Sequence, residues 1–88
     1  MQKIEIVDEI SRKTGVGRKE ALRVVEEFMK VVKDSLSNGE NVYLRGFGSF
    51  TVKRRAEKVA RHIGKNTSII IPAHDVPSFK ASDKFRLD

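Results

Sequence analysis

Arg45-Gly46-Phe47-Gly48-Ser49-Phe50 is the stretch that decides the fold of this chain, and a basic run extends from it to Lys65. Residues 45–65 carry seven Lys or Arg and one Glu, a net charge of +6 that equals the formal net charge of the whole chain. Residues 1–41 hold eight basic and eight acidic side chains and are neutral overall. Charge concentrated in one segment suits contact with a polyanion. We therefore expect residues 1–41 to act as scaffold and the basic half to meet the partner.

The glycines and phenylalanines set the local geometry of this stretch. From Asn41 to Arg45 apolar and polar residues alternate, as in a half-buried strand. Gly46 and Gly48 permit a sharp bend and close backbone approach between the aromatic anchors Phe47 and Phe50. The pattern predicts two antiparallel strands joined by a two-residue hairpin, within a sheet over residues 41–80.

The basic run after Val52 predicts a protruding arm. Neither alternating face of residues 53–63 is apolar enough to lie on a core. Residues 64–67 have turn chemistry, and residues 68–71 return as a β-branched strand that stops at Pro72. A two-stranded ribbon over about residues 53–72 would reach about 33 Å at 3.3 Å per residue. That length is about one turn of B-DNA.

The spacing of apolar residues within residues 1–39 predicts a helical hairpin. Ile4, Val7 and Ile10 form one apolar stripe on a first helix, which should end near Thr14-Gly15. A second helix with a broad apolar face should end at Asn38-Gly39. Its apolar residues could be the ordinary core of a hairpin. We favour a core shared between two chains, because one small chain cannot cover them.

Length and composition limit the class of protein. Eighty-eight residues allow a single domain, 1–88, with a marginal core. No cysteine is present, so disulfides and thiolate metal sites cannot support that core, and oligomerisation remains. The N-terminus lacks the apolar run of a secretory signal, and no stretch approaches the length of a membrane span. We expect a cytoplasmic protein.

The motifs taken together resemble the HU/IHF family of histone-like, DNA-bending bacterial proteins, essentially end to end. The resemblance is carried by residues 46–50, then by Arg55-Ala56-Glu57, Arg61, residues 69–73 and residues 76–80. It implies an α+β fold: a helical hairpin, a three-stranded antiparallel sheet with a two-stranded β-arm, a short C-terminal helix, and an intertwined dimer. It also implies that the arms lie in the minor groove of DNA and that an apolar residue at each tip wedges between base pairs.

The chain departs from the family pattern at two places. The arm tip reads Arg61-His62-Ile63-Gly64, so the wedge position carries Ile63 in place of the usual proline. Ile63 could instead be a cross-strand partner at the tip. Near the C-terminus, Ser82-Asp83 replaces the usual glycine-lysine. Ser82 could cap the short helix expected within residues 82–88.

These readings assign roles to individual residues. We expect phosphate contacts from cations and from close backbone approach, at Lys3, Gly46, Gly48, Lys53, Arg54, Lys65, Lys80 and Lys84. Minor-groove contacts are expected from Arg55, Lys58, Arg61 and His62, with Ile63 as the wedge. The shared dimer core should contain Val25, Phe28, Met29, Val32, Leu44, Phe47, Phe50 and Phe79.

Other function classes have little support. His62 and His74 are the only imidazoles, neither lies in a nucleophile motif, and no phosphate-binding glycine loop is present. The pair His74-Asp75 is read as a surface turn rather than a catalytic base and its orienting group. We therefore expect no enzyme activity, no cofactor and no metal site. The partner should be double-stranded DNA, contacted by a homodimer or by a heterodimer with a paralogue. An acidic protein partner and sequence-specific bending of the IHF kind remain alternatives.

Overall fold

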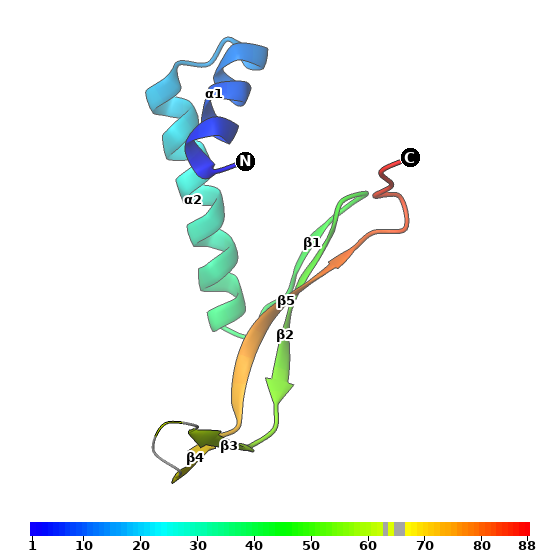
Figure 1. The fold of residues 1–88 in the computed structure, drawn as a ribbon. Helices are drawn as coiled ribbons and strands as arrows, with labels where there is room; N and C mark the ends of the chain where they lie inside the picture. Colours follow the sequence, from blue (N-terminus) through cyan, green and yellow to red (C-terminus); the bar gives the residue numbers. More distant parts are fainter. Residues whose placement is uncertain (63, 65–66) are drawn as a thin grey trace.

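The computed structural model describes residues 1–62, 64 and 67–88, and shows two helices followed by antiparallel strands (Figure 1). The elements are α1 (Lys3–Thr14), α2 (Arg18–Ser37), β1 (Val42–Leu44), β2 (Gly48–Arg55), β3 (Lys58–His62), β4 (Thr67–Ile71) and β5 (His74–Ala81). The predicted α+β class, the helical hairpin and the three-stranded antiparallel sheet are confirmed.

The helices end where the sequence predicts. Gly15 follows α1 with φ of 77°, and its N–H donates to the carbonyl of Ser11 at 3.0 Å. Gly39 lies just beyond α2 with φ of 79°, in the left-handed region that glycine adopts without strain. Arg18 Nε donates to Asp8 Oδ1 at 2.6 Å, which ties the start of α2 to α1.

The main sheet has the strand order β1-β2-β5, and both pairs are antiparallel. The N–H of Phe47 donates to the carbonyl of Leu44 at 2.9 Å, and Gly46 has φ of 80°. Leu44 pairs with Gly48, so three residues form the loop. The predicted two-residue hairpin was therefore wrong, because the positive φ at Gly46 closes a turn that leaves Phe47 outside the ladder.

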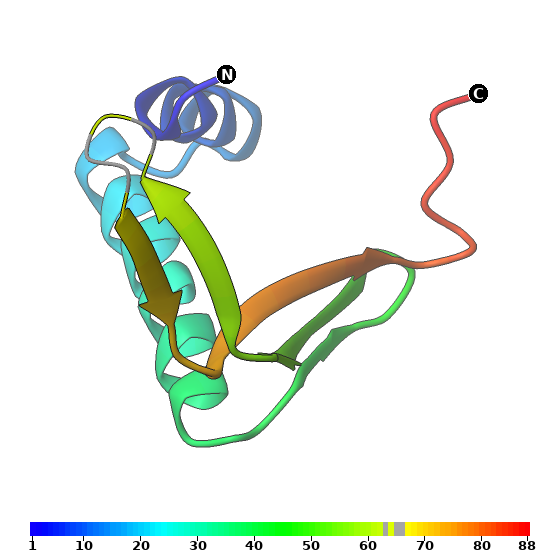
Figure 2. The same cartoon turned by 60° about the horizontal axis from the view of Figure 1, so that its bottom comes forward.

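The arm is a separate two-stranded sheet. β3 and β4 pair from Lys58 with Ile71 to His62 with Thr67. Residues 53–55, which the sequence placed in the arm, instead pair with residues 74–76 of β5 and belong to the main sheet. The ladder breaks at residues 56–57 and 72–73, where Pro72 has no N–H to donate. Beyond this break β3 and β4 turn away from the main sheet (Figure 2).

The predicted C-terminal helix is not formed. Residues 83–84 make a single turn, in which Ser82 Oγ accepts from the N–H of Lys84 at 3.2 Å and the Ser82 carbonyl accepts from Phe85 at 2.9 Å. Ser82 therefore caps a turn that does not continue. A segment of this length is too short to offset the cost of helix nucleation. Phe85 packs on Phe47 instead, with ring centroids 5.0 Å apart.

The helical hairpin and the sheet diverge from the link between α2 and β1 like the two sides of a V (Figure 1). Val7 and Ala21 are the only buried hydrophobic residues within the described part of the chain. The Cα radius of gyration is 18.4 Å, whereas a compact domain of this length would have about 12 Å. The accessible surface is 7815 Å², against about 5,200 Å² for a compact monomer of this mass. One chain therefore leaves an unusually large surface open.

Candidate nucleic-acid interface

The register of the main sheet separates its residues into two faces. On one face Phe50 pairs with Phe79, next to Leu44 and Gly48. Because side chains alternate along a strand, the opposite face carries a different set. We call this set the polar face: Tyr43, Ser49, Thr51, Lys53, Arg55, His74, Val76, Ser78 and Lys80.

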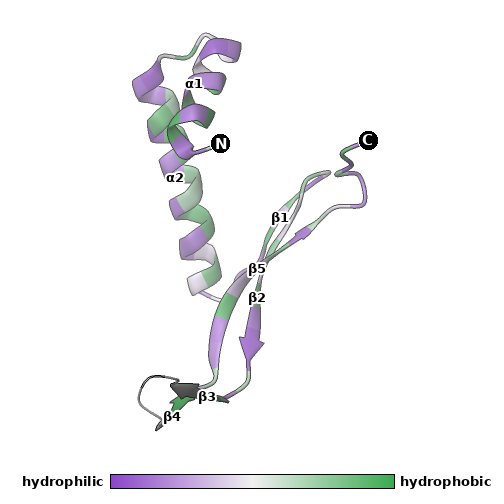
Figure 3. Cartoon of the chain, viewed as in Figure 1, coloured by the Kyte–Doolittle hydropathy of each residue, from purple (hydrophilic) through white to green (hydrophobic). Residues whose placement is uncertain are grey.

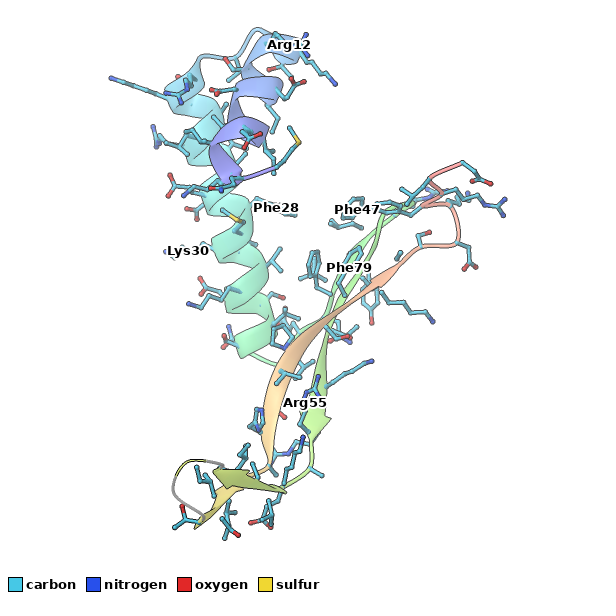
Figure 4. All side chains as sticks on the ribbon, in the orientation of Figure 1. Arg12, Phe28, Lys30, Phe47, Arg55 and Phe79 are labelled. Atoms are coloured by element: carbon cyan, nitrogen blue, oxygen red, sulfur yellow. The ribbon has the colours of Figure 1, made fainter. Side chains whose placement is uncertain are left out.

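Three cations of the polar face run along the sheet toward the arm. Lys80 pairs with Ser49 near the glycine turn, and Arg55 pairs with His74 in the last rung before the break. Lys53 lies between them on β2, about 6.8 Å from Arg55 at 3.4 Å per residue. All three side chains are exposed, and none forms an ion pair with another described residue. The face is therefore a cationic track that leads from the body to the arm, with Arg55 at its arm end (Figure 4).

Arg54 lies on the opposite face from its neighbours Lys53 and Arg55. It pairs in register with Asp75, and its Nη1 is 3.1 Å from Asp75 Oδ1. Lys3 is also engaged, with its Nζ 3.8 Å from Glu26 Oε2. Both ion pairs are exposed to solvent, where such pairs contribute little stability and can exchange partners.

The two glycines of the turn differ in their surroundings. A Cβ at Gly48 would lie 2.5 Å from the Phe79 ring and 2.6 Å from the Lys80 carbonyl oxygen. A Cβ at Gly46 would meet nothing within 4 Å, although its φ is positive. Gly48 is thus required for packing between β2 and β5, while Gly46 is required by its backbone conformation and is open to a ligand.

A shallow hollow of about 370 Å³ lies beside this turn. It brings together Arg45, Lys80, Ser49 and Ser82 with the exposed backbone of Gly46, and Asp83 is the one acidic residue among the described residues that line it. Guanidinium, ammonium, hydroxyl and backbone N–H groups are those that bind phosphate oxygens. The sequence analysis did not place Arg45, Ser49 or Ser82 in the site, because the hollow depends on the return of β5 beside β2. Lys84 lies in the turn that follows Ser82.

The described arm residues combine charge with exposed apolar side chains. Lys58 is exposed and pairs with Ile71, while Val59 and its partner Ile70 are exposed by 65% and 63%. Figure 3 shows β4 as a hydrophobic strand. The run Ile69-Ile70-Ile71 was predicted as the returning strand of the arm, but its exposed apolar side chains were not assigned a role in the site. Ile63, Lys65 and the side chains of Arg61 and His62 lie outside the described residues.

The aromatic residues lie on the other side of the sheet from the polar face. The Phe47 and Phe50 rings lie 5.5 and 4.9 Å from the Phe79 ring. Phe47 and Phe79 project into the open V, toward which Phe28 points from α2 (Figure 4). These three side chains are exposed by 46%, 43% and 47%. Most of the other predicted core residues are also only partly covered: Val25, Met29, Val32 and Leu44.

A hollow of about 620 Å³ lies between the end of α2 and the sheet. Met29, Val32 and Leu36 line it from α2, and Phe50 and Val52 line it from β2. This hollow and the side of the sheet that carries Phe47, Phe50 and Phe79 both expose apolar side chains toward the V. The chain has no element of its own among the described residues that fills it.

The described residues contain no group of three or more His, Asp or Glu side chains placed to hold a metal ion. None of the helices in this part of the chain has the length and apolar content that crossing a bilayer requires.

Comparisons with known proteins agree with this arrangement. The family model described as "Bacterial DNA-binding protein" matches residues 1–88. The chain is 36% identical over 80 residues to the SPbeta prophage-derived DNA-binding protein HU 2 of Bacillus subtilis, covering 91% of this chain and 87% of that protein. It is 34% identical over 86 residues to the integration host factor subunit alpha of Burkholderia pseudomallei, covering 98% of this chain and 75% of that one.

A solved structure is also close to the whole fold. The cocrystal structure of Anabaena HU with DNA superposes with a TM-score of 0.90 at 35% identity, covering 97% of this chain and 92% of the other. This chain therefore belongs to the HU/IHF family of bacterial DNA-binding proteins.

Proposed function

We propose that this protein is an architectural component of the nucleoid that binds double-stranded DNA largely without sequence specificity and bends it. Two chains form the binding unit, and each chain lays its β-arm in the minor groove. The single observation that carries the proposal is the cationic track of the polar face, because Lys80, Lys53 and Arg55 lead along β2 and β5 to the arm.

Phosphate contacts account for most of the binding in this proposal. The proposed contacts are Lys3, Lys53, Arg54, Lys65, Lys80 and Lys84, with close approach at the backbone of Gly46 and Gly48. The hollow beside the turn supports a phosphate site there, to which Arg45 contributes. Contacts of this kind position a protein on DNA without reading its sequence.

The arm supplies the bend. Arg55, Lys58, Arg61 and His62 enter the minor groove, and Ile63 takes the wedge position between base pairs. Exposed Val59 and Ile70 support this role, since apolar side chains can pack on the sugars that wall the groove. The minor groove distinguishes base pairs poorly, so contact there favours shape over sequence.

The dimer is supported by the surface that one chain leaves open. The half-exposed phenylalanines and the hollow along α2 form one apolar surface across the V. A monomeric protein rarely exposes so large an apolar patch. A second copy of the chain would bury it, and a paralogue with the same face would do so equally well.

The salt dependence of DNA affinity tests the proposal. If the dimer neutralises about 6–10 phosphates, the affinity for a short duplex should fall about 10³- to 10⁵-fold between 50 and 200 mM salt. An acidic protein is titrated under the same conditions, because an acidic protein is the alternative partner to DNA. A nearly salt-independent affinity for DNA, or a preference for the acidic protein, would contradict the proposal.

Competition between duplexes separates architectural binding from sequence-specific bending of the IHF kind. A/T-rich, G/C-rich, nicked and pre-bent duplexes are compared at one salt concentration. We expect a preference for nicked and pre-bent DNA, because the deformation is already made. Strong selection of one intact sequence would favour the IHF kind of function.

A further inference from the structure

His74 occupies the junction between the main sheet and the arm. It is the first residue of β5 and pairs in register with Arg55, in the last rung before the ladder breaks. It therefore belongs to the polar face, in line with Lys53 and Arg55, and its side chain is exposed. The sequence analysis treated His74 as part of a surface turn, and neither the family assignment nor the proposed contacts give it a role.

A hydrogen bond fixes which ring nitrogen of His74 is free. Nδ1 lies 2.9 Å from the carbonyl oxygen of Pro72. A carbonyl oxygen can only accept, so Nδ1 carries the ring proton in this contact. The nitrogen left for a ligand is Nε2, which is a lone-pair acceptor in the neutral ring. Such an atom repels a phosphate oxygen, whereas a protonated Nε2 donates to it.

None of the acidic side chains near His74 forms an ion pair with its imidazole within the described residues. Lys53 and Arg55 stand beside it on the polar face, while Arg54 and Asp75 pair with each other on the opposite face at 3.1 Å. Glu57 and Lys58 follow across the break in the ladder. Within the described residues His74 takes part in no ion pair. An anion at the arm root would therefore meet the imidazole and Arg55 together.

We propose that His74 is a DNA phosphate contact that forms only when its imidazole is protonated, so that DNA binding by this protein takes up a proton at the arm root. The inference rests on the proposed function, since the anion it invokes is a phosphate of the duplex beside the polar face. Arg55 supplies the permanent charge and the imidazolium supplies a second, conditional one.

The direction of the pH effect follows from linkage. The complex holds more protons than the free protein, so the affinity for DNA rises as the pH falls. Histidine is the side chain whose charge ordinarily changes between pH 5 and 8, and the DNA phosphates stay ionised throughout. His62 is the other histidine and is itself a proposed minor-groove contact. The experiment must therefore distinguish a pH effect that comes from His62 from one that comes from His74.

The test compares four proteins on one duplex: wild type, His74→Gln, His74→Lys and His62→Gln. Affinities are measured from pH 5.5 to pH 8.0 at constant ionic strength, with thermal unfolding as the check that each variant folds. We expect wild-type affinity to rise by about fivefold to tenfold for each His74 on going from pH 8.0 to 5.5, which is about 25- to 100-fold for a dimer. His74→Gln should keep the weaker affinity at every pH. His74→Lys should bind with the stronger affinity at every pH, because its ammonium is always charged.

Calorimetry in two buffers of different ionisation enthalpy counts the protons directly. Near pH 7 the wild type should take up about half a proton per chain on binding. His62→Gln should retain this uptake, and His74→Gln should abolish it. A His74→Gln variant that keeps the wild-type pH dependence, or a wild type with none, overturns the assignment while leaving DNA binding in place. Failure to bind DNA at any pH would overturn the proposed function as well.

Discussion

At the scale of single residues, the glycine turn shows that two like residues are needed for different reasons. Gly46 has φ of 80° and open space around it, whereas Gly48 leaves no room for a side chain against Phe79 and Lys80. The sequence predicted close backbone approach at both positions. It could not show that the group approaching Gly48 is the chain's own β5, because that contact joins residues some thirty positions apart.

Replacement of Gly48 by alanine should destabilise the fold. The new methyl group would lie 2.5 Å from the Phe79 ring and 2.6 Å from the Lys80 carbonyl oxygen. Overpacking of this kind costs about 1–3 kcal/mol. Gly46→Asn is the matched control, because asparagine tolerates positive φ and nothing opposes its Cβ. Urea unfolding measures both variants, and equal losses for the two would contradict the packing argument.

Arg54 and Arg55 should differ in their contribution to DNA binding although they are adjacent. Arg55 lies on the polar face, and Arg54 lies on the other face beside Asp75. Arg55→Ala should weaken DNA binding and reduce the salt slope by about one per chain. Arg54→Ala should change the slope less, because Arg54 can contact a phosphate only by giving up its ion pair with Asp75. Binding isotherms between 50 and 200 mM salt decide this, and equal effects would show that both side chains reach phosphates.

At the scale of elements, the arm is a ribbon jointed to the body rather than an extension of one pair of strands. The main-sheet ladder stops at the pair Arg55 and His74, and a new ladder begins at Lys58 and Ile71. Pro72 and the residues opposite it make the joint. The joint lets the arm take its own direction while the cationic track remains on the rigid sheet. In the proposed function, most of the phosphate contacts therefore lie outside the arm, and the wedge lies on the arm.

Replacement of Ile63 by alanine tests this division. The variant should bend DNA less and keep most of its affinity, because phosphates supply the binding and the wedge supplies the kink. Energy transfer between dyes at the two ends of a duplex reports the bend, and a parallel titration reports the affinity. Val59→Ala, on the described part of the arm, is the control for loss of an apolar side chain. Unchanged bending in Ile63→Ala would mean that this residue is not the wedge.

At the scale of the whole molecule, the open V is the reason for proposing that two chains form the stable unit. Its accessible surface of 7815 Å² exceeds the value of about 5,200 Å² for a compact monomer of this mass by about half. Phe28, Phe47 and Phe79 face the interior of the V and are 47%, 46% and 43% exposed. Folding and association should therefore occur together, and the unfolding midpoint should rise with protein concentration.

Phe28→Ala tests the shared core. Phe28 points into the V and is 47% exposed in one chain. If a second copy covers it, its loss should cost about 3 kcal/mol per chain and shift the protein toward monomer or unfolded chain. Lys30→Ala on the same helix, pointing away from the sheet, is the control. Sedimentation and thermal unfolding give the readout. A stable monomer in the wild type, with a midpoint independent of concentration, would refute the dimer.

The sequence by itself determined the elements of this protein and the location of its charge. Gly15 and Gly39 ended the helices, and alternation around Val42 and Leu44 marked the first strand. These are local signals, read from propensity and spacing. The expected C-terminal helix did not form because the segment is too short to offset the cost of nucleation. Phe85 packs on Phe47 there, a contact that no local pattern contains.

Only the tertiary structure decided how the charged residues are shared between surfaces. The pairing of β2 with β5 sets Lys53, Arg55 and His74 on one face and sends Arg54 to Asp75 on the other. The same pairing makes Gly48 indispensable and forms the hollow beside the turn. Strand pairing brings together residues that are distant in the chain. A shift of the register by one position would move each side chain of the shifted strand to the other face of the sheet. The composition of the site was thus a property of the sequence, and its geometry a property of the fold.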